Sequence, residues 1–451
     1  MMLLLVLALT PISLEDVRSA SRQNLQAIQS SLQVETAGVN RVTARSAILP
    51  RVDVSAGAQL SYFGPQRRIN TVCQQDTVTG QCQSDSSGQI IYVQKAVDTP
   101  PVSFGNFNAG ITVSQLLYDG GKWWNQIAQA TSQEDAAKGQ YAEQRMASEL
   151  EAVRRFYELV RAQLTLKVLN SSIERSKDQL MRATSLYEAG RGQRRDVLDA
   201  EVNLGNDEIL AMRQEQSIAA AQVDLLEWLG RPSEEVEAVV PRAMSPTVVP
   251  LAAPDGSKLL ELARHQRPLI QSLEAQVRVQ ELSVDIARST YFPTVSVNGG
   301  YTRNAPSADP FFTDPTKQNG LFIGLNINWN VFAGLSTVAA MDAARVQVRQ
   351  VVAQQKQALA ELDGEIRRTL RVLETQLRIS GVAEKNRSLS EKQLSVEVER
   401  FTAGASSNID VRNAQVKVTQ SQLTQLQGRV DVEIARAALS RVSGAPLEGS
   451  P

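Results

Sequence analysis

Residues 187–200 read YEAGRGQRRDVLDA, and residues 401–414 read FTAGASSNIDVRNA, 214 positions later. Both stretches carry Ala-Gly and then Asp-Val-x-x-Ala at the same spacing. A second matching pair, ARSAILPRVDVSAG at 44–57 and ARSTYFPTVSVNGG at 287–300, is separated by 243 positions. The difference between the two offsets places a longer insert after residue 57 of the first copy. Because an internal repeat constrains the architecture before any local pattern does, we interpret the chain as one unit present twice.

Each copy predicts the order helix, strand, loop, strand, long helix, turn and helix. The first copy, 13–230, has helices 14–49, 122–187 and 193–230 and strands 51–62 and 104–117. The second copy, 257–444, has helices 257–292, 336–401 and 408–443 and strands 294–304 and 320–332. Segment 231–256 contains five prolines and is predicted to be an extended connection around the outside of the helices, because proline fixes φ and removes a backbone donor. Residues 445–451 form a short tail.

The two longest helices, 122–187 and 336–401, are predicted from their composition and from their apolar spacing. The first contains no proline and is rich in good helix formers. Its apolar positions Leu150, Val153, Tyr157, Val160 and Leu164 are spaced 3, 4, 3 and 4, which is the seam of a coiled coil. At a rise of 1.5 Å per residue each helix spans roughly 100 Å. The seam alone would also fit a plain dimeric coiled coil.

The four strand segments alternate between apolar and polar side chains. In 51–62, for example, Val52 and Val54 share one face, and Asp53 and Ser55 share the other. A membrane-spanning strand needs roughly 9–11 residues, with one face toward lipid and one toward a lumen. We therefore predict membrane strands whose polar face, uncharged beyond the start of the first strand, lines water. A soluble sandwich is the alternative, but it needs a second layer that no remaining segment supplies.

Four strands in one chain leave two open sheet edges, which lipid does not tolerate because the edge backbone groups stay unsatisfied. Two chains would give eight strands, whose side chains fill the interior, whereas three chains give twelve strands and a lumen. The small polar residues of the inner face suit water, so we expect a homotrimer. The predicted fold is mainly α with a membrane β-barrel contribution: a 12-stranded barrel and an α-helical coiled-coil tunnel.

Aromatic residues gather at the helix-side ends of the strands, as is typical of a membrane–water interface. They are Tyr118, Trp123, Trp124, Trp329 and Phe332. A second group, including Tyr62, Phe63, Phe104 and Tyr301, lies toward the other ends. The two groups predict contact with membrane lipid at both ends of the strands.

Composition excludes several classes of function. The net charge is −1, so no strong basic field favours nucleic acid. No run of 18 or more apolar residues occurs, which argues against an ordinary spanning helix. The single histidine, His265, lies beside no nucleophile, and we expect neither an enzyme nor a bound cofactor or metal.

The two cysteines, Cys73 and Cys82, both lie in the polar insert of the first copy. A zinc site would need about four ligands, whereas two cysteines nine positions apart fit a disulfide in an oxidising compartment. The alternative is a pair of free thiols in an unstructured loop. We predict the disulfide, which agrees with export from the cytoplasm.

Residues 1–12 resemble a shortened or mis-started export signal. The apolar run Leu3 to Leu9 is at the lower end of the length of a signal-peptide core, and no Lys or Arg precedes it. The alternative is an apolar N-terminus without a targeting role. Ser13 then suits the N-cap of the helix that begins at residue 14.

The duplicated aromatic-x-x-Gly and Asp-Val-x-x-Ala pattern, on this order of elements, resembles the TolC-like outer-membrane efflux proteins over roughly residues 13–444. The resemblance implies a trimer in the bacterial outer membrane, with a 12-stranded barrel and a helical tunnel in the periplasm. It also implies an exit duct for an inner-membrane pump, joined to it through a periplasmic adaptor. The helix turns then form the periplasmic tip, where the tunnel narrows and the adaptor docks.

Some members of this family close the aperture with two rings of aspartates from the second copy. Asp410 matches the first position, but the second is Asn413. Three carboxylates and three amides should bind cations less strongly than six carboxylates, because clustered carboxylates raise the local negative potential. Phe401 stands where some members carry tyrosine, and Ser406 where they carry arginine, so the latch contacts of those members are not expected here.

The first copy contributes Tyr187, Asp196 and Asp199 to the expected aperture. Asp196 and Asp410 also suit the N-caps of the helices that follow them, because aspartate accepts hydrogen bonds from free backbone amides. Both interpretations of these two aspartates stay open.

The first turn is also unusually basic. It contains Arg191, Arg194 and Arg195. These arginines would either form ion pairs between helices or subunits, or contact the adaptor. The alternative is ordinary solvated charge, since exposed ion pairs contribute only about 0–1 kcal/mol. The expected docking surface consists of Gly190, Arg191, Arg194, Arg195, Gly404 and Ala405.

The sequence therefore predicts the passive exit channel of a tripartite efflux or type I secretion system, gated at its periplasmic tip by adaptor binding. The alternative is a trimeric structural or adhesive stalk, anchored by the barrel and without transport. The polar inner face of the strands favours the channel, because an anchor would tolerate bulky apolar residues there.

Overall fold

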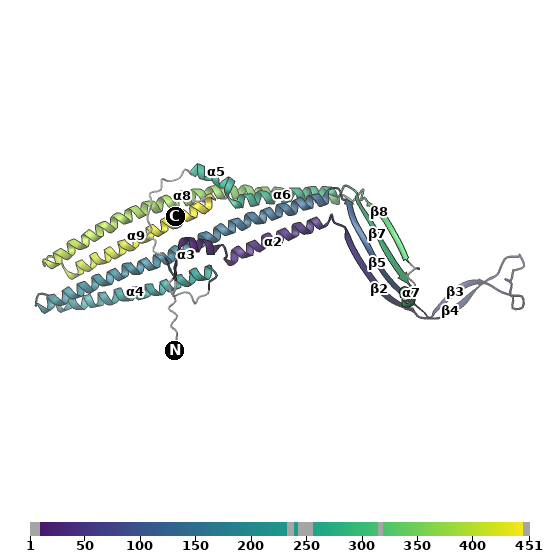
Figure 1. Cartoon of the computed structure of the whole chain (residues 1–451), viewed down its shortest axis with the longest axis horizontal. Coiled ribbons are helices and arrows are strands. Elements are labelled where there is room, and N and C mark those ends of the chain that lie inside the picture. The colour runs from purple at the N-terminus through teal and green to yellow at the C-terminus, as the bar shows by residue number, and fades with distance from the viewer. Residues whose placement is uncertain (1–9, 232–238, 242–255, 314–318, 445–451) are drawn as a thin grey trace. The chain divides into compact units, whose positions relative to one another are not determined.

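The computed structural model describes residues 10–231, 239–241, 256–313 and 319–444. The chain divides into a helical unit and a sheet unit (Figure 1). The helical unit comprises Met1–Val42, Gln126–Val284 and Met341–Pro451, and the sheet unit comprises Thr43–Asn125 and Asp285–Ala340. Each unit is described by itself below.

The elements follow the predicted order of helices and strands, with additions in each half. The first half contains β1 (Thr10–Ile12), α1 (Leu14–Ser21), α2 (Leu25–Ser46), β2 (Arg51–Phe63), β3 (Gln66–Cys73), β4 (Tyr92–Thr99), β5 (Val102–Tyr118), α3 (Lys122–Glu188) and α4 (Arg194–Trp228). The second contains β6 (Val239–Pro241), α5 (Gly256–Gln266), α6 (Pro268–Ser289), β7 (Thr294–Ala305), α7 (Ala308–Thr313), β8 (Asn319–Asn328), α8 (Ser336–Thr402) and α9 (Asn408–Ser443). The long helices α3 and α8 have 67 residues each.

The sheet unit is built on four antiparallel strands in the order β2-β5-β7-β8. β2 pairs with β5 from Arg51↔Ser114 to Phe63↔Val102, and β8 pairs only with β7. β2 and β8 are therefore the two edges of this sheet, as the four-strand prediction required. The period-two pattern places most of the apolar residues on one face, and several of them are almost fully exposed, such as Leu321 at 88% and Ile323 at 85%.

The insert of the first half is not the polar loop that the sequence predicted. β3 and β4 form a hairpin in which Gln66 pairs with Thr99, continuing the register that ends at Phe63↔Val102. The sequence analysis missed the alternation of apolar and polar residues, because Arg and Asn interrupt the apolar residues of β3 and Lys interrupts those of β4. The predicted disulfide is confirmed: Cys73 and Cys82 are bonded, with their Cα atoms 5.5 Å apart.

The predicted continuous helix 14–49 is wrong, because the chain breaks between α1 and α2. Ser13 caps α1 as predicted, in a capping box with Asp16. At the break, Asn24 is buried, its side-chain oxygen accepts from the amide of Gln26, and its side-chain nitrogen donates to the carbonyl of Trp228 (2.6 Å). A side chain that binds its own backbone competes with the helix, and asparagine does this readily.

The predicted continuous helix 257–292 is wrong for a different reason. Pro268 is the first residue of α6, and proline disfavours helical geometry in the residue before it, here Arg267. Proline has no backbone N–H to donate, but the first residue of a helix has no partner for that group, so Pro268 can start α6. Pro268 therefore ends α5 and starts α6.

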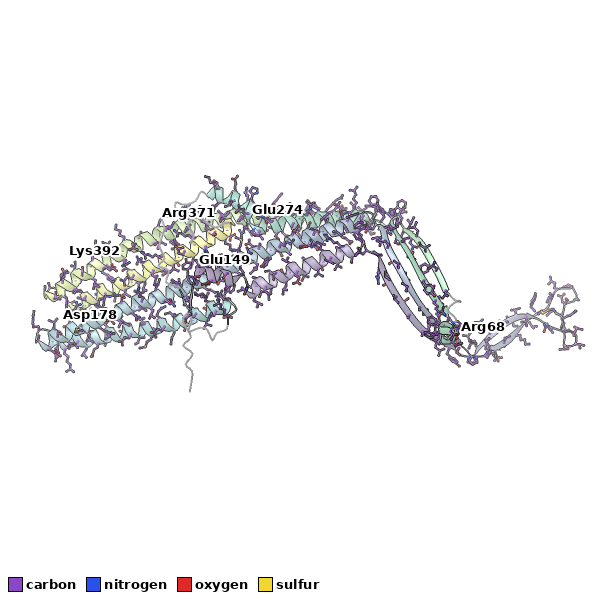
Figure 2. All side chains as sticks on the ribbon, in the orientation of Figure 1. Arg68, Glu149, Asp178, Glu274, Arg371 and Lys392 are labelled. Carbon is purple, nitrogen blue, oxygen red and sulfur yellow. A yellow bond between two sulfur atoms is a disulfide. The ribbon has the colours of Figure 1, made fainter. Side chains whose placement is uncertain are left out.

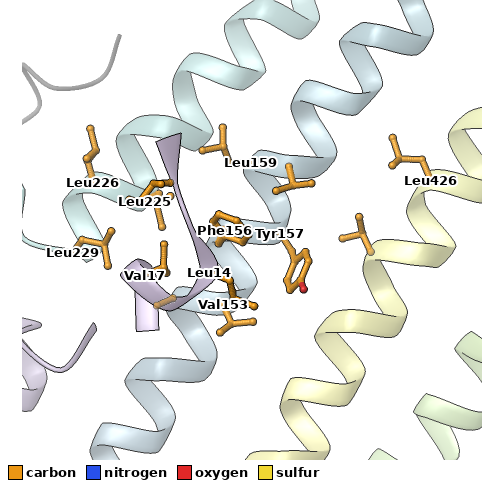
Figure 3. Close-up of a cluster of buried hydrophobic side chains, with 14 residues drawn as sticks. Leu14, Val17, Val153, Phe156, Tyr157, Leu159, Leu225, Leu226, Leu229 and Leu426 are labelled. Carbon is orange, nitrogen blue, oxygen red and sulfur yellow. The ribbon is translucent and has the colours of Figure 1, made fainter. Parts of the chain in front are cut away.

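Two apolar clusters lie beside these breaks in the helical unit. In the first, Val17 of α1 packs with Phe156 of α3 and Leu225 of α4, all with 0% exposure (Figure 3). The second contains Leu259 of α5, Ile366 of α8 and Leu439 of α9. Each broken helix thus places a short segment over the seam of the long helices.

The long helices pair with the shorter ones that follow them. α3 lies beside α4, where Gln214 donates to the carbonyl of Ala162, and α8 lies beside α9, where the Ser390 and Ser421 hydroxyls are 2.6 Å apart (Figure 1). Charged side chains such as Asp178 and Lys392 point outward (Figure 2). Each pair is a helical hairpin.

The predictions for the chain ends and for the connection 231–256 concern residues that lie largely outside the described part of the chain. Of the signal-like segment 1–12, Thr10–Ile12 form β1, which pairs in parallel with β6. Of the connection 231–256, the structure describes residue 231, β6 and Gly256; the tail 445–451 lies outside the described residues. Within the described residues, no helix combines the length and the apolar character that a membrane span requires.

Candidate functional site at the helix turns

The turns after α3 and α8 have the same backbone geometry. Gly190 and Gly404 have φ values of +71° and +75°, a region that residues with a Cβ rarely adopt. In each turn, the amide after the glycine donates to a carbonyl five residues back: Arg191 to Leu186 (2.9 Å) and Ala405 to Arg400 (2.8 Å). This is the Schellman ending of a helix, and it explains why both turns carry glycine.

Asp410 occupies the first turn of α9, but it is not the N-cap that one interpretation proposed. Ser407 is the N-cap, and its amide and hydroxyl both donate to the carboxylate of Asp410 (3.0 and 2.6 Å). These hydrogen bonds from Ser407 hold the pKa of Asp410 below its usual value. Asp196 is not an N-cap either, since Gln193 occupies that position in α4.

The other predicted aperture residues are mostly accessible in the chain. Asn413 is exposed and lies three residues after Asp410 on α9, so the two share one helix face. Tyr187 is 45% exposed, and Phe401 is half-buried. Asp410 and Asn413 therefore lie on one exposed face of α9 in the chain, and their place in an aperture stays a prediction.

The arginines of the first turn behave as exposed surface charge within one chain. The side chains of Arg191 and Arg194 are exposed, and Arg195 pairs with Asp199 of its own helix (3.5 Å). Because both partners of that pair are well exposed, the pair adds little to stability. Arg195 and Asp199 do not link the two hairpins.

A link between the hairpins is made instead by Asn408, which the sequence did not single out. This residue is buried, accepts a hydrogen bond from the Gln179 side chain (2.7 Å) and donates to the carbonyl of Asp196 (3.3 Å). Asn408 therefore joins the start of α9 to both α3 and α4.

One turn further along α9, Arg412 makes a bidentate contact between the hairpins. Its guanidinium donates to both carboxylate oxygens of Asp207 on α4 (2.8 and 2.9 Å), and Ser176 of α3 donates to the same carboxylate (2.6 Å). Burial would raise the pKa of Asp207, but the hydrogen bonds from Arg412 and Ser176 outweigh burial and leave this pKa below its usual value. We call Ser176, Gln179, Asp207, Asn408 and Arg412 the tip network.

Ser176 and Gln179 of the tip network belong to a second buried stripe of α3, which follows the apolar seam along the helix. The buried positions Leu169, Ser172, Ser176, Gln179 and Ala183 keep the spacing 3, 4, 3 and 4. The seam counted from the sequence did not lead to these positions, because Leu169 comes five residues after Leu164, and the spacing of 3 and 4 continued from Leu164 gives 167, 171 and 174. The partners Asp207 and Arg412 carried no local signal, because 205 positions separate them.

The sheet unit holds the remaining predicted residues. Trp123 and Trp124 stack with ring centroids 3.7 Å apart, and Trp329 donates from its ring nitrogen to the carbonyl of Tyr291 (3.1 Å). Tyr118 is 44% exposed and Phe332 78% exposed. Exposed aromatic rings at the ends of strands with one apolar face suit a lipid–water boundary. Among the described residues, no group of three or more His, Cys, Asp or Glu side chains is placed to hold a metal.

A sheet with one exposed apolar face and one polar face, joined to two long helical hairpins, defines the class of outer-membrane export channels. A family model described as "Outer membrane efflux protein" matches residues 16–231 and 259–445. The chain therefore belongs to the outer membrane efflux protein family, and its place is the outer membrane of bacteria. The helices of this family form a tunnel in the periplasm.

Named relatives agree with this assignment. The chain is 23% identical over 344 residues to the outer membrane efflux protein BepC of Brucella suis, covering 74% of this chain and 71% of BepC. It is also 23% identical over 372 residues to the proteases secretion protein PrtF of Dickeya chrysanthemi, covering 78% and 71%. The fold matches the open state of the Neisseria gonorrhoeae MtrE outer membrane channel, with a TM-score of 0.75, 15% identity and coverage of 96% and 89%.

Proposed function

We propose that three copies of this chain form a passive exit channel of a tripartite export system. The observation that carries the proposal is the four-stranded sheet, in which the edge strands β2 and β8 each pair on one side among the described residues and carry exposed apolar residues such as Val54 (77%) and Leu321 (88%). In lipid, those edges need partner strands. Pairing β2 of one copy with β8 of the next satisfies the edges, and three copies give a barrel of 12 strands with a lumen.

The interior of that barrel would carry the polar face of the sheet. Asn298, Asn326 and Thr112 lie on this face, where the Asn326 and Asn298 side chains are hydrogen-bonded (2.5 Å). Amides and hydroxyls hold water, so the lumen would be wet. This polar lining disfavours the alternative of an anchored stalk without transport. The chain would act without catalysis, and energy would come from an inner-membrane pump.

We place the gate at the periplasmic ends of the helical hairpins. The seam of α3 is apolar around Phe156 and Leu159 but polar at Ser176 and Gln179. Separating an apolar seam exposes area that costs about 25 cal/mol per Å², whereas separated polar groups exchange their partners for water at a modest net cost. The hairpins would therefore separate first at the tip network.

The exposed turns are our candidate for adaptor docking. Gly190, Arg191, Gly404 and Ala405 are all exposed, and the glycines hold the two turns in one shape. In this proposal, a periplasmic adaptor contacts both turns and stabilises the separated hairpins. The aperture itself would be lined by Asp410 and Asn413.

The test is single-channel conductance of the purified protein in a planar bilayer, paired with its mass in detergent. A trimer that conducts steadily, with current that rises when the tip network is broken, supports the gated channel. A trimer without conductance, even after Arg412→Ala, would replace the channel with the anchored stalk. A monomer or dimer would remove the 12-stranded barrel.

A further inference from the structure

Aromatic side chains interrupt the polar face of the sheet, although that face otherwise carries amides, hydroxyls and glycines. Phe322 of β8 shares the face with Asn326 and Asn328, because side chains two residues apart in a strand point the same way. It is 40% exposed. A large apolar ring on the water side of a channel wall is not explained by the packing of the sheet against lipid.

Glycines surround Phe322 on this face. Gly320 and Gly324 precede and follow it along β8, and Gly300 pairs with it across β7. A Cβ on Gly300 would lie only 3.0 Å from Cε1 and 3.1 Å from Cζ of the Phe322 ring. One edge of the ring therefore lies over Gly300, in the space that a side chain at this position would need, and Gly320 and Gly324 place no side chain beside it.

The registers place Phe322 in a row across the whole sheet. Asp53 pairs with Thr112, Thr112 pairs with Gly300, and Gly300 pairs with Phe322. Apart from the ring, the row holds a hydroxyl, a glycine and a carboxylate that already accepts from Arg51 (3.0 Å). Phe322 is thus the only apolar side chain in this row of the described sheet.

A second group of aromatic side chains lies on the same face, near the other end of the strands. Phe63 and Phe104 stack with ring centroids 5.5 Å apart and an interplanar angle of 10°. Both are about half exposed, at 50% and 49%. Phe104 pairs with Ser61 and Phe63 pairs with Val102 in the register that pairs Asp53 with Thr112, so both rings lie on the polar face and not on the face toward lipid that the sequence analysis expected.

We propose that Phe322 is a specificity-determining residue that binds flat aromatic organic solutes as they pass along the channel wall. The proposal rests on the proposed channel, because only a closed barrel turns this face toward cargo. The Phe322 ring is 40% exposed and has no side chain beside it at Gly300, Gly320 or Gly324, so a planar solute can reach it, and aromatic pairs prefer offset-stacked or edge-to-face contact. Phe63 and Phe104 offer a second contact of the same chemistry further along.

The test measures block of single-channel current by two water-soluble aromatic ions of opposite charge, 1-pyrenesulfonate and 1-pyrenemethylammonium. Phe322→Ala should weaken block by both ions roughly tenfold, since it removes both buried aromatic area and stacking. Phe322→Leu keeps an apolar side chain over Gly300 and should weaken block by both ions about threefold, the loss of stacking alone. The control is Ile323→Ala on the opposite face, which should leave block unchanged.

Three outcomes would overturn the proposal. Unchanged block in Phe322→Ala and Phe322→Leu would show that the ring does not contact cargo. A loss for only the cation or only the anion would show a charge effect instead of aromatic recognition. An equal loss in Ile323→Ala would show a general change in the sheet. Absence of current in the unmodified protein would instead refute the channel itself.

Discussion

Arg412 of α9 and Asp207 of α4 form a bidentate ion pair that joins the two helical hairpins, with distances of 2.8 and 2.9 Å. Only 6% of the Asp207 side chain and 20% of the Arg412 side chain are exposed. This pair occupies the tip of a protein that has phenylalanine and serine at the positions of the expected latch, Phe401 and Ser406. We infer that the Arg412–Asp207 pair holds the hairpins together, in place of a latch formed at positions 401 and 406.

Breaking this pair should open the proposed gate. Arg412→Ala leaves a buried carboxylate without its partner, a change that costs roughly 3–5 kcal/mol in a protein interior. We expect the mean single-channel conductance to rise several-fold. Asp199→Ala is the control, because its exposed pair with Arg195 lies within one helix. Equal conductance in Arg412→Ala and the unmodified protein would contradict this role.

The same pair gives a pH dependence with a definite sign. The pKa of Asp207 is below its usual value, since hydrogen bonds from Arg412 and Ser176 outweigh burial. A lowered pKa contributes stability that is fully present above the unfolded pKa, about 3.9, and is lost as the pH falls through the folded pKa. Conductance should therefore stay low from neutral pH to about 4 and rise below it. In Asp207→Asn, this acid-induced rise should disappear.

Block of the current by divalent cations tests whether Asp410 and Asn413 line the aperture, and a substitution of Asn413 gives a clearer result than one of Asp410. Removing Asp410 also removes the capping box with Ser407, so Asp410→Ala changes two things at once. Asn413→Asp adds a carboxylate on the same exposed face and leaves the cap intact. We expect tighter block by Mg²⁺ in Asn413→Asp and weaker block in Asp410→Ala, because clustered carboxylates attract cations. Unchanged block in both would place the aperture elsewhere.

Periodicity explains which parts of the fold were predictable. The four strands were found within a few residues, because alternation is a local pattern that a half-exposed sheet must show. The long helices were found from their helix-forming composition and their apolar spacing of 3 and 4, and their ends from the glycines at 190 and 404. The breaks at Asn24 and Arg267 were missed because apolar spacing runs on through both positions, although Pro268 was a clear signal.

The tip network was harder to predict, because it depends on pairing between distant segments. Ser176 and Gln179 were missed because the buried stripe of α3 changes phase between Leu164 and Leu169, so the seam counted from Leu150 does not lead to them. That Asp207 would meet Arg412 follows only from how the two hairpins pack. The arginines at 191, 194 and 195 attracted the prediction because they cluster in sequence, whereas Arg412 is the single basic residue of 401–414.

Gly404 is a sensitive position in the second turn. Its φ of +75° is costly for a residue with a Cβ, by roughly 1–2 kcal/mol. Gly404→Val should therefore distort the turn and reduce export in cells, through tip closure or adaptor docking. Gly381→Ala is the matched control, since a Cβ there meets nothing within 4 Å and the residue lies inside α8. Unimpaired export by Gly404→Val would remove this turn from the mechanism.

Arg267 allows a test of what fixes the break between α5 and α6. It lies between these two helices, with 4% of its side chain exposed. It donates to Glu365 of α8 (2.7 Å) and to Glu143 of α3 (3.2 Å), and Arg441 of α9 also binds Glu143 (2.8 Å). Arg267→Met would leave Glu365 without this cation, and breaking a buried pair costs roughly 3–5 kcal/mol.

We therefore expect Arg267→Met to lower the thermal unfolding midpoint by several degrees in circular dichroism. Arg345→Met is the control, because Arg345 forms an exposed pair with Asp342 on one helix, and such pairs contribute about 0–1 kcal/mol. Equal midpoints for the two variants would mean that the apolar cluster of Leu259, Ile366 and Leu439 holds the break without the ion network. A lower midpoint in Arg267→Met alone would show that charge fixes the position of the broken helix.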